Sequence, residues 1–167
     1  MPSGQLRPAA GWLAVIRRYL VAVTAGNLLW EIAQLPLYTL WQSGSGREIT
    51  KAVLHCTIGD VAIASVALLL SLALLGAPEW PETRMGSAIT GLVAIGVSYT
   101  IYSEYMNAIV QRSWSYTAMM PTLPWLGTGL SPLAQWLLIP PAALWWSAGA
   151  FRNPKLHTSD GVSLCMK

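Results

Sequence analysis

Four long stretches of the chain are almost free of charged residues, and charged or turn-forming residues separate them. A helix that crosses a membrane needs about 20 consecutive, mostly apolar residues. The pattern therefore predicts four transmembrane helices, at Tyr19–Trp41, Ala52–Leu75, Met85–Ile109 and Thr128–Ala150. A short interfacial helix, Gly11–Arg18, is expected to lead into the first of them.

Prolines fall inside two of these predicted helices. Pro36 lies near the end of the first helix, and Pro140 and Pro141 lie in the middle of the fourth. Each proline removes a backbone donor. We therefore expect kinks at both places.

Three of the four stretches contain a single formal charge, and each time it is an acid. The acids are Glu31, Asp60 and Glu104, while the fourth stretch contains none. A carboxylate surrounded by lipid costs about 3 kcal/mol or more unless it is paired, protonated or hydrated. Each of these acids is therefore a candidate for a functional site.

The composition agrees with a membrane protein. Only 10% of residues are charged and 54% are hydrophobic, whereas about 25% of residues are charged in a soluble domain. The net charge of +3 is dispersed, which argues against a nucleic-acid partner. We expect an all-α, integral membrane four-helix bundle at 19–150. It would follow a cytoplasmic or interfacial N-terminus (1–18) and precede a cytoplasmic tail (151–167).

The distribution of basic residues predicts the orientation, because cytoplasmic loops are enriched in Lys and Arg. With both termini in the cytoplasm, the basic residues inside are Arg7, Arg17, Arg18, Arg84, Arg152, Lys155 and Lys167, and those outside are Arg47, Lys51 and Arg112. The excess inside favours this orientation. The long connection Val110–Gly127 would then lie outside. It is rich in aromatic residues, and it would fold over the mouth of the bundle or rest on the lipid headgroups.

Polar residues recur at helical spacing on every predicted helix, which places them on one face of each. The stripes are Asn27, Glu31 and Gln34; Cys56 and Asp60 flanked by His55; Thr100, Ser103, Glu104 and Asn107; and Ser131 and Gln135. A rise of about 1.5 Å per residue puts all of them in the outer half of the membrane. Because lipid cannot satisfy polar groups, the stripes should face one another.

The sequence thus predicts a polar pocket in the outer half of the bundle. Its expected walls are Trp30, Tyr102 and Trp136, and its expected cover is Trp114, Tyr116 and Trp125. The candidate catalytic groups are Glu31, Asp60, Glu104 and His55. The candidate ligand-binding groups are Asn27, Gln34, Asn107, Trp114, Tyr116 and Gln135.

Acid–base chemistry on a lipophilic small molecule is the first interpretation of this pocket. A protonated carboxyl group could protonate an alkene or polarise a carbonyl, and a second carboxylate or His55 could return the proton. Aromatic walls suit a cationic intermediate. The reaction would be that of an isomerase, cyclase or hydratase.

Other interpretations stay open. A metal cofactor is not favoured and no metal ligands are assigned, because zinc, copper and iron sites usually contain two or more histidines. Proton- or ion-coupled transport would require a homo-oligomer. The chain could also be an accessory subunit with a partner in a larger membrane complex. Finally, the polar residues could simply join the helices, at about 0.6–2 kcal/mol per contact.

Three strings of the sequence resemble an uncharacterised family of small, four-span bacterial inner-membrane proteins. They are NLLWEIAQLPLYTLW (27–41), LHCTIGD (54–60) and SEYMNAIVQRSWSYTAMMPTLPWLGTGLSPLAQW (103–136). The resemblance implies a multi-pass protein of the bacterial inner membrane and no particular activity. A fainter likeness, to membrane carotenoid enzymes of the lycopene-cyclase and hydratase type, rests on Glu104, the Trp114–Tyr116 stretch and the Gly127–Pro132 turn.

Overall fold

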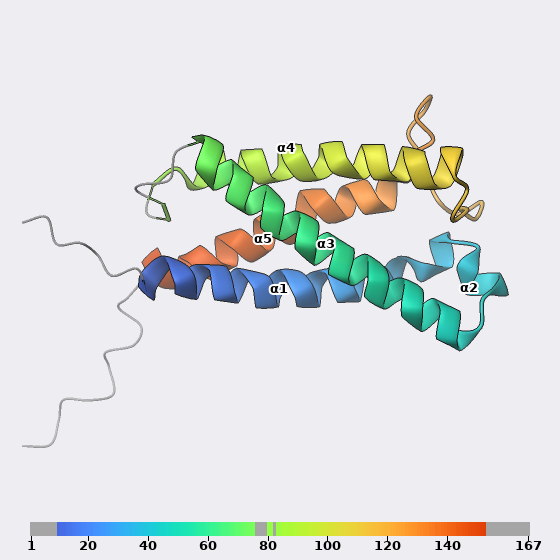
Figure 1. The fold of residues 1–167 in the computed structure, drawn as a ribbon, viewed down its shortest axis with the longest axis horizontal. Helices are drawn as coiled ribbons and strands as arrows, with labels where there is room; N and C mark the ends of the chain where they lie inside the picture. Colours follow the sequence, from blue (N-terminus) through green and yellow to red (C-terminus); the bar gives the residue numbers. More distant parts are fainter. Residues whose placement is uncertain (1–9, 76–79, 82, 153–167) are drawn as a thin grey trace, which may run out of the picture.

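The computed structural model describes residues 10–75, 80–81 and 83–152, and its regular structure is entirely helical. The four long helices are α1 (Ala10–Gln34), α3 (Gly46–Leu75), α4 (Met85–Glu104) and α5 (Leu130–Arg152). Three short elements lie together at one end of the molecule (Figure 1): the 3₁₀ turn η1 (Leu35–Leu37), α2 (Leu40–Ser43) and the π-helical turn η2 (Tyr105–Val110). The prediction of an all-α protein is confirmed. The predicted tails at 1–9 and 153–167 lie outside the described residues.

Within the part of the chain that the structure describes, three helices are long and apolar enough to cross a membrane. They cover Gly11–Leu37, Gly46–Leu75 and Met85–Val110. These segments contain the first three predicted transmembrane helices, apart from the end of the first. The predicted fourth helix is present as α5 and runs on through Pro140 and Pro141.

The start of the chain differs from the prediction. Gly11–Arg18 is not a separate interfacial helix, because α1 is continuous from Ala10 to Gln34. The predicted first helix, Tyr19–Trp41, is also too long. Pro36 ends the α-helix instead of bending it, and η1 and α2 follow.

The second long helix begins earlier than predicted because it is capped. The carboxylate of Glu48 accepts hydrogen bonds from the backbone N–H of Ser45 (2.8 Å) and from its hydroxyl (2.7 Å). This Ser-x-x-Glu arrangement is a capping box, which satisfies donors that are otherwise free at the start of a helix. Helix α3 therefore begins at Gly46, not at Ala52.

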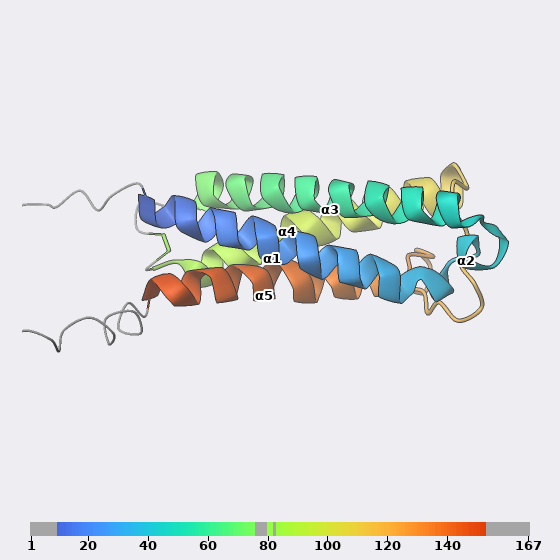
Figure 2. The ribbon, with the colours of Figure 1, turned by 90° about the horizontal axis from the view of Figure 1, so that it is seen from below.

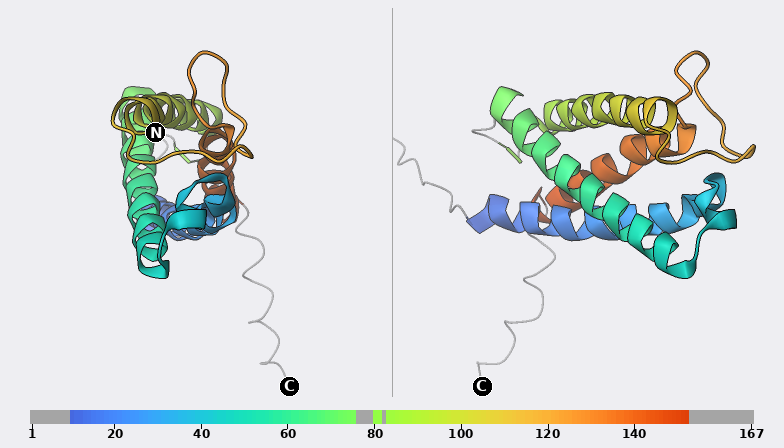
Figure 3. Two further views of the ribbon diagram at one scale, coloured as in Figure 1. Left: turned by 90° about the vertical axis from the view of Figure 1, so that its right-hand side faces the viewer. Right: turned by 45° about the vertical axis from the view of Figure 1, so that its right-hand side comes forward.

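The long helices form a ring in which each contacts two neighbours. Helix α1 packs against α3 and α5, and α4 packs against the same two helices. Seen from the end, α3 and α5 stand on opposite sides, between α1 and α4 (Figure 3). Figures 1 and 3 also show that α3 meets α4 where α3 ends, and diverges from α4 toward the end that holds α2.

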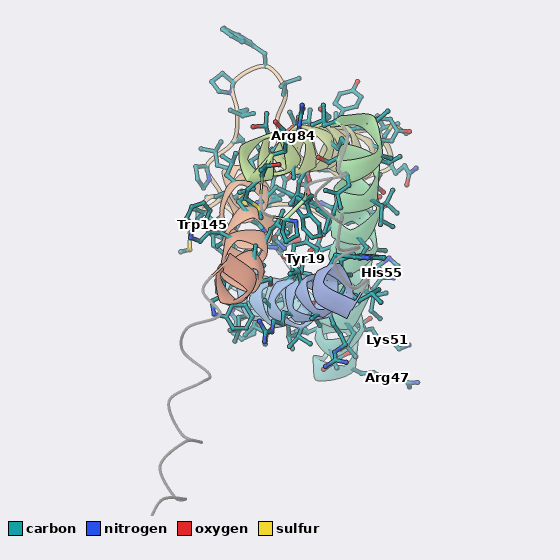
Figure 4. The ribbon with its side chains drawn as sticks, turned by 90° about the vertical axis from the view of Figure 1, so that its left-hand side faces the viewer. Tyr19, Arg47, Lys51, His55, Arg84 and Trp145 are labelled. Carbon is teal, nitrogen blue, oxygen red and sulfur yellow. The ribbon has the colours of Figure 1, made fainter. Side chains whose placement is uncertain are left out.

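The end of the ring where α3 meets α4 is filled by apolar side chains and close backbone contacts. The Ser71 hydroxyl donates a hydrogen bond to the carbonyl of Ala88 (2.9 Å) and joins α3 to α4. Tyr19 points into the space between the helices (Figure 4) and donates to the carbonyl of Ala64 (3.3 Å). Further core residues include Val15, Val23, Leu68, Leu92 and Leu144. This half of the molecule leaves little room for a ligand.

The segment 111–129 crosses the opposite end and is held there by backbone hydrogen bonds. Thr39 N–H donates to the carbonyl of Ser115 (3.0 Å), and Thr117 N–H donates to the carbonyl of Leu37 (2.9 Å). The rings of Tyr38 and Tyr116 pack edge to face, with centroids 5.5 Å apart. The part of the segment around these contacts therefore closes the end of the ring beside α2.

Candidate functional site

A cavity of about 390 Å³ lies in the half of the molecule where α3 and α4 diverge. All four long helices contribute to its lining. Its polar lining residues include Glu31, Gln34, His55, Cys56, Asp60, Thr100, Ser103, Glu104, Asn107, Ser113 and Gln135. The apolar part of the lining includes Leu35, Ile63, Tyr99 and Trp136. The polar stripes of the helices thus converge on one cavity.

Glu31 of α1 and Asp60 of α3 form a pair of carboxyl groups within hydrogen-bonding range of each other. The amide of Gln34 donates to Glu31 Oε1 (2.8 Å). The amide of Gln135, from α5, donates to Asp60 Oδ2 (2.8 Å) and to Asn27 Oδ1 (3.1 Å). A hydrogen bond between two carboxyl groups needs a proton on one of them. The pair is therefore a place where the protein can hold a proton.

A second polar cluster surrounds Glu104, near the end of α4. The Tyr116 hydroxyl donates a hydrogen bond to the Glu104 carboxylate, and its oxygen accepts one from Gly129 N–H (3.2 Å). Burial raises the pKa of the Tyr116 hydroxyl above its usual value, and the neighbouring Glu104 raises that pKa further. Tyr116 therefore stays protonated and acts as a donor to Glu104 at physiological pH.

The two clusters belong to the same site but do not touch. Glu104 is close enough to Glu31 and Asp60 to repel them electrostatically, without a hydrogen bond to either. The three acids that the sequence singles out thus surround one cavity. Two of them lie within hydrogen-bonding range of each other, and the third accepts a hydrogen bond from Tyr116.

The remaining predicted residues differ in whether they line the cavity. His55 is exposed at the rim of the cavity, and Asn107 donates its amide to the Ser103 carbonyl (2.9 Å). Asn27 is buried behind Gln135 and does not line the cavity. Tyr116 does not line it either, but holds Glu104.

Trp114 lines the cavity beside the Glu104 cluster. Its indole N–H is buried and lies close to Glu104 and Tyr116, without ideal hydrogen-bond geometry to either.

Three of the expected walls and covers are wrong. Trp30 and Tyr102 do not line the cavity, and Tyr102 faces outward with 62% of its surface exposed. Trp125 does not cover the cavity, because it is fully exposed and is not among the lining residues. Trp136 is a wall as expected, and its ring packs against Gly96 of α4.

Tyr38 and Tyr99 line the cavity, although neither is among the predicted site residues. Tyr38 follows the turn at Pro36, which brings it back over the cavity. Burial raises the pKa of the Tyr38 hydroxyl, with a smaller contribution from Glu104. The position of Tyr38 depends on the contact with Tyr116, which no local pattern indicates.

Among the residues that the structure describes, no three His, Cys, Asp or Glu side chains are placed to hold a metal ion. The cavity acids are two carboxyl groups in contact and a third at a distance. This arrangement fits proton handling better than metal coordination.

No family model, curated protein or solved structure matches this chain. We therefore infer the chemistry of the site from its side chains.

Proposed function

We propose that all four long helices cross the inner membrane of a bacterial cell, with both termini in the cytoplasm. Helix α5 packs against α1 and α4 and crosses from one to the other along the molecule (Figures 1 and 2). It is not among the helices that are long and apolar enough to cross a membrane by hydropathy, since it contains Ser131, Gln135 and two prolines. Its polar side chains Ser131 and Gln135 bond to α1 and α3 instead of facing outward. In this orientation the cavity lies in the outer half of the membrane.

We propose further that the cavity binds a small lipophilic molecule and converts it by acid–base chemistry. The observation that carries this proposal is the contact between Glu31 and Asp60 at a cavity with apolar walls. Small-molecule pockets typically enclose about 300–1,000 Å³ and combine apolar walls with a few convergent polar groups. The cavity, at about 390 Å³, belongs in this range.

The pair supplies both halves of an isomerisation. The shared proton of Glu31 and Asp60 is added to one carbon of an alkene and leaves a cation on the neighbouring carbon. The carboxylate that remains then removes a proton from an adjacent carbon and restores the pair, so no cofactor is consumed. The amides of Gln34 and Gln135 stabilise the carboxylate by donating to it. Glu104 and the ring of Trp136 would stabilise the cation.

Mass spectrometry of lipids extracted from the purified protein tests this function. The cavity is filled in the Gly59→Phe variant, because Gly59 lines the cavity and a side chain there meets no other atoms. Gly86→Phe is the matched control, because Gly86 is equally unobstructed and does not line the cavity. We expect a stoichiometric lipophilic compound in the wild type and in Gly86→Phe, and its loss from Gly59→Phe. Equal amounts in the two variants would contradict cavity binding.

The isosteric variant Asp60→Asn separates binding from conversion. It preserves the shape of the cavity but removes one acid of the pair. We expect this variant to retain a ligand whose mass or isomer composition differs from that of the wild type, because the unconverted form accumulates. If both proteins contain the identical compound, the cavity binds the ligand but does not convert it.

Proton transfer across the membrane is a second candidate function, and the same carboxyl pair favours it. Buried acids are typical of proton pathways in membranes. If the chain carries protons, proteoliposomes with an internal pH-sensitive dye will acidify in response to a pH gradient, and Asp60→Asn will abolish the response. Lipid extracts would then contain no stoichiometric ligand.

A further inference from the structure

The cavity has exposed lining residues on its side, His55 of α3 and Tyr99 of α4, and one at its end, Ser113. The backbone of 115–117 is hydrogen-bonded to 37–39 across the end. On the side, α3 and α4 diverge (Figures 1 and 3). In a membrane this side of the cavity faces the lipid tails of the outer leaflet.

A stripe of basic residues leads along α3 to this side of the cavity. Arg47, Lys51 and His55 are spaced four residues apart, which places them on one face of the helix. All three are exposed, and Figure 4 shows them projecting from the same side of α3. Arg47 and Lys51 form no ion pair within the described structure, and the nearby Glu48 is occupied by the capping box at Ser45. The side chains of Arg47 and Lys51 are therefore free to contact a ligand.

The stripe lies at the depth of lipid headgroups. Helix α3 has 30 residues and is thus about 45 Å long at about 1.5 Å per residue, whereas the apolar core of a bilayer is about 30 Å thick. The charged first turns of α3 would extend into the headgroup layer. His55, about 12 Å further along the helix axis than Arg47, lies where the headgroup layer gives way to this side of the cavity.

We propose that this stripe binds the anionic phosphate headgroup of an amphiphile whose apolar chain enters the cavity between α3 and α4. The inference rests on the proposed function and narrows its ligand to a lipid-like molecule with a phosphate head. Electrostatic interactions orient the bound amphiphile, because the acids of the cavity repel its anionic head while Arg47 and Lys51 attract it. The reactive part of the chain is thereby directed toward Glu31 and Asp60.

Native mass spectrometry of the full-length protein in detergent tests the proposal. The probes are phosphatidic acid and phosphatidylcholine with the same acyl chains, and the readout is the apparent Kd of the first bound lipid. We expect phosphatidic acid to bind about tenfold or more tightly than phosphatidylcholine. The Arg47→Gln/Lys51→Gln double variant should lose this preference and leave phosphatidylcholine binding unchanged.

The Arg17→Gln/Arg18→Gln double variant is the control, because it removes two exposed positive charges from α1, far from α2. It should retain the preference for phosphatidic acid. An equal loss in both double variants, or no preference in the wild type, would overturn the headgroup site. Displacement of phosphatidic acid by inorganic phosphate at millimolar concentration would show a site for free phosphate and overturn the assignment to an amphiphile.

Failure of the headgroup site and failure of the cavity are distinguishable. Gly59→Phe blocks the cavity and should weaken the binding of both lipids. The Arg47→Gln/Lys51→Gln variant should weaken only the binding of phosphatidic acid. If Gly59→Phe changes neither Kd, the lipids do not enter the cavity and the proposed function fails. If Gly59→Phe weakens the binding of both lipids equally and the Arg47→Gln/Lys51→Gln variant has no effect, only the proposed headgroup site is wrong.

Discussion

Each of the lone acids has a different set of partners. Asp60 and Glu31 contact each other and receive donors from Gln135 and Gln34, whereas Glu104 receives one from Tyr116. Gln34 lies three residues from Glu31 on the same helix. Gln135 and Tyr116 each lie on a different element from the acid to which they donate. The sequence pattern therefore located the acids, but only Gln34 could be paired with its acid from helical spacing.

The Tyr116→Phe variant should destabilise the protein. It leaves the Glu104 carboxylate and the Gly129 N–H without the hydroxyl that bonds to both. Loss of a buried hydrogen-bond partner costs about 1–3 kcal/mol, and we expect a lower Tm by a few degrees. The control is Tyr102→Phe, whose ring is 62% exposed and does not line the cavity. An equal Tm for the two variants in thermal unfolding would contradict a structural role for Tyr116.

At the scale of elements, close backbone approach determines how the helices cross. A Cβ added at Gly96 of α4 would lie 2.1 Å from Cε3 of Trp136, and one at Gly91 would lie 2.3 Å from the Ser71 hydroxyl. These contacts let α4 approach α5 and α3 closely, as small residues commonly do between membrane helices. Sequence patterns located the long helices, but the end of α1 before Pro36 and the start of α3 after the Ser45–Glu48 capping box differ from the prediction, which followed the apolar pattern instead of these signals.

Gly96→Ala should therefore push Trp136 into the cavity or separate α4 from α5. Overpacking of this kind costs about 1–3 kcal/mol. We expect a lower Tm and a shifted tryptophan emission, because Trp136 is only 3% exposed. Gly86→Ala is the matched control, because a Cβ there meets no atoms, and it should have no such effect. Equal behaviour of the two variants would show that the ring can move aside without cost.

At the scale of the whole molecule, the proposed orientation can be tested with the native Cys165. In a Cys56→Ala background, a membrane-impermeant maleimide should label Cys165 only after the cells are lysed. Adding Arg47→Cys should produce labelling of intact cells, because Arg47 is exposed in the first turn of α3. Labelling of Cys165 in intact cells would mean that the C-terminal side of α5 is outside, and would contradict the proposed topology.

The sequence by itself determined the all-helical class, the approximate place of each long helix and the acids worth attention. It could do so because apolar runs and helical spacing are local properties of the chain. Only the tertiary structure decided which acids pair, because Glu31, Asp60 and Gln135 come from three different helices. It also decided that Tyr38, not Trp125, faces the cavity, and that exposed residues of α3 and α4, His55 and Tyr99, belong to its lining. These features depend on crossing geometry and loop contacts between residues far apart in the sequence.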